Sequence, residues 1–77
     1  MRIELCNCQQ ILLDEIADKS FKRKDVSKTY ALALRSSEDV DWKFVNKAII
    51  KRWSYNALNY ILELAWSGKC FEEKGGE

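Results

Sequence analysis

Apolar residues recur at helical spacing along nearly the whole chain, and no proline interrupts the pattern. The spacing predicts four helices: about 8–18, from about 22 or 25 to 35, from the residue after Asp41 to the junction at 51–54, and about 55–67. Side chains that cap helix N-termini stand at these boundaries, namely Asn7, Ser20 or Asp25, Asp41 and Ser54. Gly68 suits the left-handed residue that ends a helix. We therefore expect an all-α fold, a small bundle of about four helices.

The third and fourth predicted helices meet at residues 51–54 with almost no linker, so they must cross at an angle. This indicates a helix-turn-helix-like arrangement of the last two helices. The match to the DNA-reading motif is partial. Lys51, Arg52 and Trp53 stand in the turn, where that motif has a glycine and apolar neighbours.

The last helix has an unusually wide apolar face. Its expected core side comprises Leu58, Ile61, Leu62, Ala65 and Trp66, and adding Ala57 and Leu64 widens the apolar arc. The arc then covers roughly 200°, whereas the buried face of a peripheral helix needs about 100°. We expect this helix to lie centrally in the bundle. The alternative is a homodimer through the last helix, with Tyr55, Trp66 and Phe71 as aromatic anchors.

Length and composition fit one small domain. The chain has 77 residues, of which 47% are hydrophobic, and we assign 1–71 to a single helical domain and 72–77 to a disordered tail. Three cysteines, Cys6, Cys8 and Cys70, form an odd set without a secretory signal, which favours reduced thiols in a cytoplasmic or otherwise intracellular protein. No segment is long and apolar enough to predict a membrane span.

The sequence contains no pattern that supports an enzyme. It has no histidine, and its glycines are confined to Gly68, Gly75 and Gly76, so neither a histidine-based acid–base site nor a glycine-rich phosphate loop is present. Three thiols in a C-x-C arrangement plus one distant cysteine do not have the spacing of a structural zinc site. We predict no catalytic residues, no metal and no cofactor.

Charge is distributed unevenly along the chain although the net charge is only +1. Residues 19–52 carry ten Lys and Arg against four Asp and Glu, whereas the segments on either side are both net negative. The basic segment contains one cluster from Lys19 to Lys28 and one stripe that repeats every fourth residue from Lys43 to Lys51. If both lie on one side of the fold, they would contact phosphates, and binding would weaken with salt.

This pattern leads to two hypotheses. The first is a small nucleic-acid-binding protein, a transcription regulator of helix-turn-helix type, with duplex DNA as the expected partner. Its expected contact residues are Lys43, Lys47, Lys51, Arg52, Ser54, Asn56, Asn59, Tyr60, Lys22, Arg23, Lys24 and Lys28. Asparagines near the start of the last helix pair well with adenine in the major groove, and cations hold phosphates. The second hypothesis is a helical protein-interaction module, an adaptor or subunit, in which the lysines serve only solubility.

Overall fold

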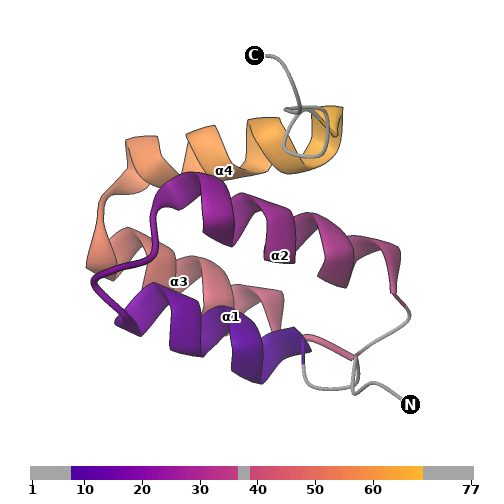
Figure 1. Ribbon diagram of the computed structural model, residues 1–77, viewed down its shortest axis with the longest axis horizontal. Coiled ribbons are helices and arrows are strands. Elements are labelled where there is room, and N and C mark those ends of the chain that lie inside the picture. Colours follow the sequence, from indigo (N-terminus) through magenta and orange to yellow (C-terminus); the bar gives the residue numbers. More distant parts are fainter. Residues whose placement is uncertain (1–7, 37–38, 69–77) are drawn as a thin grey trace.

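The computed structural model describes residues 8–36 and 39–68, and these residues form four helices and no strand (Figure 1). The helices are α1 (Cys8–Ala17), α2 (Arg23–Arg35), α3 (Trp42–Arg52) and α4 (Tyr55–Ser67). The predicted all-α bundle of four helices is confirmed, and so is the short junction between the last two. The expected crossing of these two helices at an angle is not found, because α4 folds back after the junction and runs in the direction opposite to α3 (Figure 1). Asn7, Cys6, Cys70, Phe71 and the predicted tail lie outside the described residues.

Local interactions explain three of the helix ends, namely the starts of α3 and α4 and the end of α4. The Asp41 carboxylate accepts a hydrogen bond from the Phe44 N–H at 3.2 Å, and the Ser54 hydroxyl oxygen accepts one from the Ala57 N–H at 3.2 Å. These bonds satisfy N–H groups that have no partner within a helix. Gly68 ends α4 with φ of 77°, the left-handed conformation in which a Cβ would be strained. The predicted caps at both ends of α4 are therefore confirmed.

The four helices occupy the corners of a square, and successive helices run in opposite directions (Figure 1). α1 packs against α2 and α3, and α4 also packs against α2 and α3. α1 and α4 consequently lie at opposite corners and make no close backbone contact. Because α4 packs against α2 and α3 only, the charged side chains near its outer face come from those two helices and not from α1.

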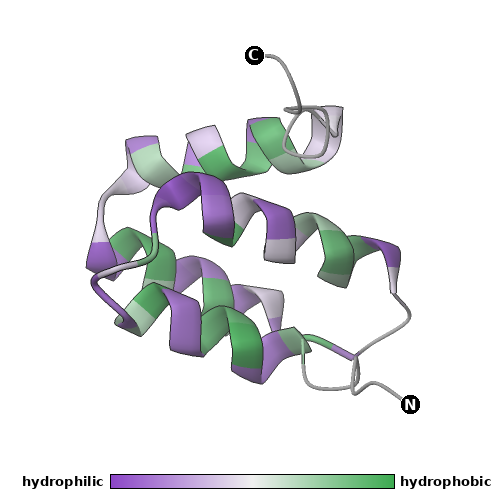
Figure 2. Ribbon diagram, in the orientation of Figure 1, coloured by the Kyte–Doolittle hydropathy of each residue, from purple (hydrophilic) through white to green (hydrophobic). Residues whose placement is uncertain are grey.

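Each helix contributes an apolar face to one core. Figure 2 shows hydrophobic and hydrophilic residues alternating turn by turn along all four helices. The largest fully buried apolar side chains come from every helix, namely Leu12, Val26, Val45, Ile49 and Ile61. Each helix therefore contributes at least one of these residues, and together they form a single hydrophobic cluster between the four amphipathic helices.

Two side-chain contacts of Tyr30 span the bundle between the diagonal pair α2 and α3. The Tyr30 ring packs on the Trp42 ring with a centroid separation of 4.5 Å and an interplanar angle of 41°. The Tyr30 hydroxyl donates a hydrogen bond of 2.8 Å to Asn46 Oδ1. Because the backbones of α2 and α3 do not approach each other closely, these side chains connect the two helices directly.

Two expectations about α4 were wrong. The helix lies at a corner of the square and not in the centre, since it packs against two helices only. Trp66, assigned to its core side, is 70% exposed. The buried arc of α4 is centred on Ala57, Leu58, Ile61 and Ala65, and Trp66 lies beyond its edge on the solvent side. The wide apolar arc thus consists of a buried centre with the half-buried Leu62 and Leu64 and the exposed Trp66 at its edges.

Candidate nucleic-acid interface

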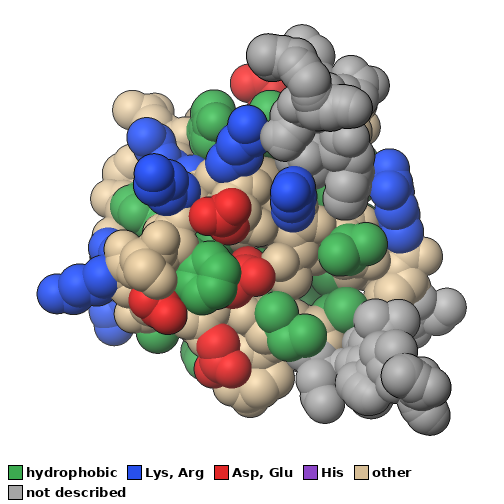
Figure 3. All heavy atoms as spheres, viewed as in Figure 1, with side chains coloured by type: hydrophobic (Ala, Val, Ile, Leu, Met, Phe, Trp, Pro, Cys, Tyr) green, Lys and Arg blue, Asp and Glu red, His purple; other side chains and the backbone are tan. Residues whose placement is uncertain are grey.

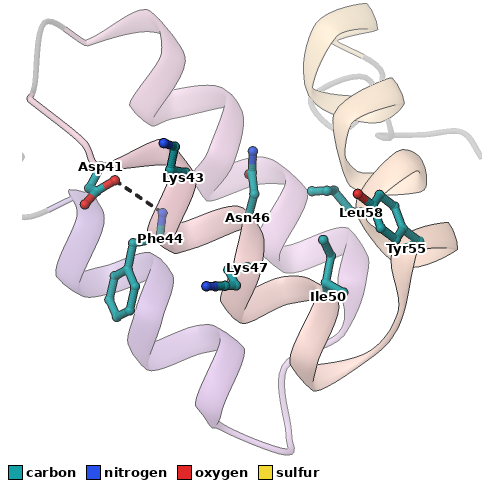
Figure 4. A pocket seen from close by; sticks show the side chains of 8 residues that line it. All are labelled: Asp41, Lys43, Phe44, Asn46, Lys47, Ile50, Tyr55 and Leu58. Carbon is teal, nitrogen blue, oxygen red and sulfur yellow. Dashed lines mark hydrogen bonds between the residues drawn. The ribbon is translucent and has the colours of Figure 1, made fainter.

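The predicted basic stripe runs along the exposed side of α3, the helix that packs beside the start of α4. Lys43, Lys47 and Lys51 are exposed and follow one another at four-residue intervals, so they lie along one side of α3. Lys43 and Lys47 line an open groove of about 460 Å³, and its other wall includes Tyr55 at the start of α4 (Figure 4). The remaining lining residues are Asp41, Phe44, Asn46, Ile50 and Leu58. In Figure 4, Asn46 and Ile50 lie on the side of α3 that faces Tyr55 and Leu58, whereas the ammonium groups of Lys43 and Lys47 point away from α4. The α3 cations therefore lie on a helix next to α4 but do not lie against it.

The basic cluster on α2 borders α4 on its other side. Lys22, Arg23, Lys24 and Lys28 are all exposed, and the Arg23 guanidinium lies 5.2 Å from the centroid of the Tyr60 ring on α4. A cation over an aromatic face is attracted by the electron density of the ring, so this contact holds the start of α2 against α4. The structure thus brings two basic segments that are distant in sequence to the two sides of one helix.

Sequence reasoning missed one member of the α2 cluster. Arg35 lies on the same side of α2 as Lys24 and Lys28, at offsets of eleven and seven residues. It reaches the far end of α4, because its guanidinium lies 3.9 Å from the position that a Cβ on Gly68 would occupy. The helical spacing of these three cations is the signal that would have identified Arg35.

Arg52 is placed apart from the other predicted contacts. Its Nε donates a hydrogen bond of 3.0 Å to the Ile16 carbonyl oxygen at the end of α1, and its guanidinium lies 5.1 Å from the centroid of the Trp53 ring. The side chain is half-buried. A cation near the C-terminal carbonyls of a helix is favoured by the helix dipole. Arg52 therefore joins the α3–α4 turn to α1 and does not extend the α3 stripe.

The outer face of α4 is polar and aromatic. Its exposed residues are Tyr55, Asn56, Asn59, Tyr60, Glu63, Trp66 and Ser67. Helical geometry places Tyr55 and Trp66 along the edge next to α3, and Tyr60 and Ser67 along the edge next to α2. Asn56, Asn59 and Glu63 lie between these two edges. Ser54, the remaining predicted contact, is exposed at the start of the helix, where its oxygen serves as the cap.

Acidic side chains gather at the opposite corner of the bundle. α1 contains Asp14 and Glu15 but no Lys or Arg, and Asp18 follows directly. In Figure 3, Lys and Arg lie over α2 and toward α4 and also beside the turn that follows α1, whereas most Asp and Glu on the same face lie over α1. Two hydrogen bonds from Ser20, through its backbone N–H and its hydroxyl, lower the pKa of Asp18 and so favour its ionised form. The bundle thus has an acidic side and, diagonally across, a helix flanked by cations.

On this acidic side, burial disfavours the ionised form of the Glu15 carboxyl. Desolvation raises the pKa of its carboxyl, and a 2.7 Å hydrogen bond from the Thr29 hydroxyl to Oε2 only partly opposes that effect. The nearby Asp25 carboxylate raises the pKa further. Its second oxygen, Oε1, is buried without a hydrogen-bond partner. Glu15 therefore destabilises the fold when it is ionised.

Comparison of the chain with protein-family models, curated proteins and solved structures gave no match. Across residues 8–36 and 39–68, no group of three or more His, Cys, Asp or Glu side chains is arranged to hold a metal ion. No helix in that same part of the chain has both the length and the apolar character required to cross a membrane. The function must therefore be inferred from the surface of α4 and the cations on its two neighbours.

Proposed function

We propose that this protein binds duplex DNA, with α4 as the element that enters the major groove. The observation that supports this proposal is the position of α4 between two helices that carry exposed cations. Arg23 on α2 contacts Tyr60 of α4, and Lys43 and Lys47 on α3 line the groove that leads to Tyr55. The acidic helix α1 lies at the opposite corner, where it would face away from bound DNA.

The dimensions of a duplex suit this arrangement. An α-helix with its side chains is about 10–12 Å across, and the major groove of B-DNA is about 12 Å wide. Each edge of the groove is a row of phosphates. A helix lying in the groove with cations on both of its neighbours would therefore place positive charge near both rows. Lys and Arg at those positions would fix the orientation of the protein but would not read sequence.

The proposal is tested by titrating a fluorescently labelled 20-base-pair duplex with the protein at two salt concentrations. Phosphate contacts from Lys43, Lys47 and Arg23 predict a slope of log affinity against log salt near −2.7, which is a loss on the order of 40-fold between 50 and 200 mM salt. Replacement of one contacting lysine, Lys47→Gln, should weaken binding to all sequences and reduce the slope by about 1.

Gln10→Glu provides a control that changes the net charge by the same amount. Gln10 is exposed on α1, the helix that makes no backbone contact with α4, and its amide donates a hydrogen bond of 3.0 Å to Asp14. We expect this variant to retain the wild-type salt slope. Loss of affinity that is equal in Lys47→Gln and Gln10→Glu would show that only net charge matters and would contradict the proposed interface.

The second candidate function is a protein-interaction module, and the exposed aromatic edge of α4 favours it. Tyr55 is 67% exposed and Trp66 is 70% exposed, and aromatic side chains carry much of the binding energy at protein interfaces. The same titration separates the two functions. Absence of binding to any duplex at 50 mM salt would exclude the DNA-binding proposal and leave the interaction module.

A further inference from the structure

Three residues form the centre of the exposed face of α4. At 100° per residue, the exposed positions from Tyr55 to Ser67 cover one continuous arc, and Asn56, Asn59 and Glu63 lie in its middle. All three are exposed, and none of their side chains is used as a helix cap. They are therefore the side chains that would point most directly into a groove occupied by α4.

The chemistry of these three side chains suits base edges better than phosphates. An Asn carboxamide donates and accepts at once, which matches N6 and N7 of adenine in the major groove. A Glu carboxylate only accepts, which matches the N4 amino group of cytosine and repels phosphate. Cations that would hold phosphates are absent from this central strip and lie instead on α2 and α3.

The spacing of these residues matches the spacing of stacked base pairs. From Asn56 to Glu63 the helix advances about 10 Å, at about 1.5 Å per residue. That length corresponds to about three base-pair steps of about 3.4 Å. A helix lying along the groove would therefore present the two asparagines and the glutamate to neighbouring base pairs.

We infer that α4 is a sequence-reading helix whose target contains adenines opposite Asn56 and Asn59 and a cytosine opposite Glu63. The inference rests on the proposed DNA-binding function and adds the base preference to it. The lysines and arginines on the flanking helices supply affinity, whereas these three side chains supply specificity. Glu63 also excludes dockings in which the centre of α4 lies against a phosphate row, since its carboxylate would be repelled there.

The test begins with selection of binding sites from a pool of duplexes that contain ten randomised base pairs. The wild-type protein should enrich a short site with adenine and cytosine at fixed positions. Asn56→Ala and Asn59→Ala should each lose the adenine preference at one position, a reduction in discrimination of about 5- to 150-fold for a bidentate contact. Gln10→Ala on α1 is the matched control and should select the wild-type site.

A chemical probe then identifies the contacted atom. In the selected duplex, 7-deazaadenine replaces adenine at the position assigned to Asn56, which removes the N7 acceptor and leaves Watson–Crick pairing intact. The wild-type protein should bind this duplex more weakly, whereas Asn56→Ala should bind both duplexes equally. Glu63→Ala should lose the cytosine preference while its affinity for random duplex rises, because a repulsive charge is removed.

The outcomes distinguish this inference from the function on which it rests. Salt-dependent binding without any enriched site would refute sequence reading by α4 and leave the DNA-binding function intact. An enriched site that is unchanged in Asn56→Ala, Asn59→Ala and Glu63→Ala would also refute it. Absence of duplex binding at low salt would refute both. Far-UV circular dichroism of each variant verifies that loss of binding does not result from unfolding.

Discussion

The contact between Tyr30 and Asn46 gives a sharp test of how α2 and α3 are held together. Tyr30→Phe removes only the hydroxyl that donates to Asn46 Oδ1 at 2.8 Å, and the ring retains its packing on Trp42. Tyr30 is 3% exposed, and burial raises the pKa of its hydroxyl, so the group is shielded from water. A hydrogen bond of this kind contributes about 0.5–1.5 kcal/mol net. We therefore expect a loss of about 1 kcal/mol in the free energy of unfolding.

That loss is large enough to measure in a domain of this size. A chain of 77 residues is typically stable by about 4–12 kcal/mol, and 1 kcal/mol shifts the melting temperature of such a domain by about 4–8 °C. Urea unfolding followed by circular dichroism gives the free energy directly. Tyr60→Phe is the control, because Tyr60 is 41% exposed and its ring contact with Arg23 does not need the hydroxyl.

A double-mutant cycle isolates the interaction. Tyr30→Phe and Asn46→Ala should each destabilise the protein, and the double variant should lose less than the sum of the two, with a coupling of about 1 kcal/mol. Equal stability of Tyr30→Phe, Tyr60→Phe and the wild type, or a coupling of zero, would refute this account of how the two helices are connected.

Three further predictions concern the core, the α3–α4 turn and the buried carboxyl. Ile49→Ala should lower the free energy of unfolding, measured in urea, by about 2–5 kcal/mol because Ile49 is fully buried. Ile11→Ala is the control and should lower it much less, because Ile11 is 42% exposed. Similar losses in the two variants would contradict the assigned core. Arg52→Lys should destabilise the fold by about 1 kcal/mol, because the planar guanidinium of Arg52 makes both the hydrogen bond to the Ile16 carbonyl and the contact with the Trp53 ring. The same variant should leave the salt slope of DNA binding unchanged. A slope reduced by about 1 would show that Arg52 contacts a phosphate. Glu15 has a pKa raised above its ordinary value of 4.5, so its contribution is fully favourable below that value and is lost as pH rises through the raised pKa. Glu15→Gln should therefore gain stability relative to the wild type as pH rises from 4 to 7, and parallel stability curves would show that its carboxyl is not perturbed.

The helices and their ends could be predicted because their causes are local. The apolar spacing, the Asp41 and Ser54 caps and the left-handed Gly68 depend on residues within one or two helical turns of each other. At the second helix the candidate caps were Ser20 and Asp25. The structure places Lys22 at the cap position, with the Asp25 carboxylate accepting a 3.2 Å hydrogen bond from its N–H. The identity of the α2 cap depends on where the turn after α1 ends, and the spacing of apolar residues does not determine that position.

The placement of the candidate interface could be predicted only in part. Lys43 and Lys47 lie on one side of any helix that contains both, but only packing decides that they line a groove together with Tyr55 of α4. Arg52 continues the run of cations in sequence, yet a carbonyl group 36 residues earlier in the chain accepts its hydrogen bond. Trp66 looked like a core residue because the sequence does not reveal how many neighbours a helix has. Each of these facts depends on which helices occupy adjacent corners.

The separation of acidic and basic helices also affects the approach to a partner. The net charge of +1 gives little overall attraction to a polyanion, but α1 carries acids and no cation, whereas exposed cations lie on α2 and α3, and this separation gives the molecule an electric dipole. The field of a polyanion exerts a torque on such a dipole, which turns α4 toward it and α1 away before the surfaces meet. The molecule would therefore arrive already oriented, and added salt would slow the encounter itself.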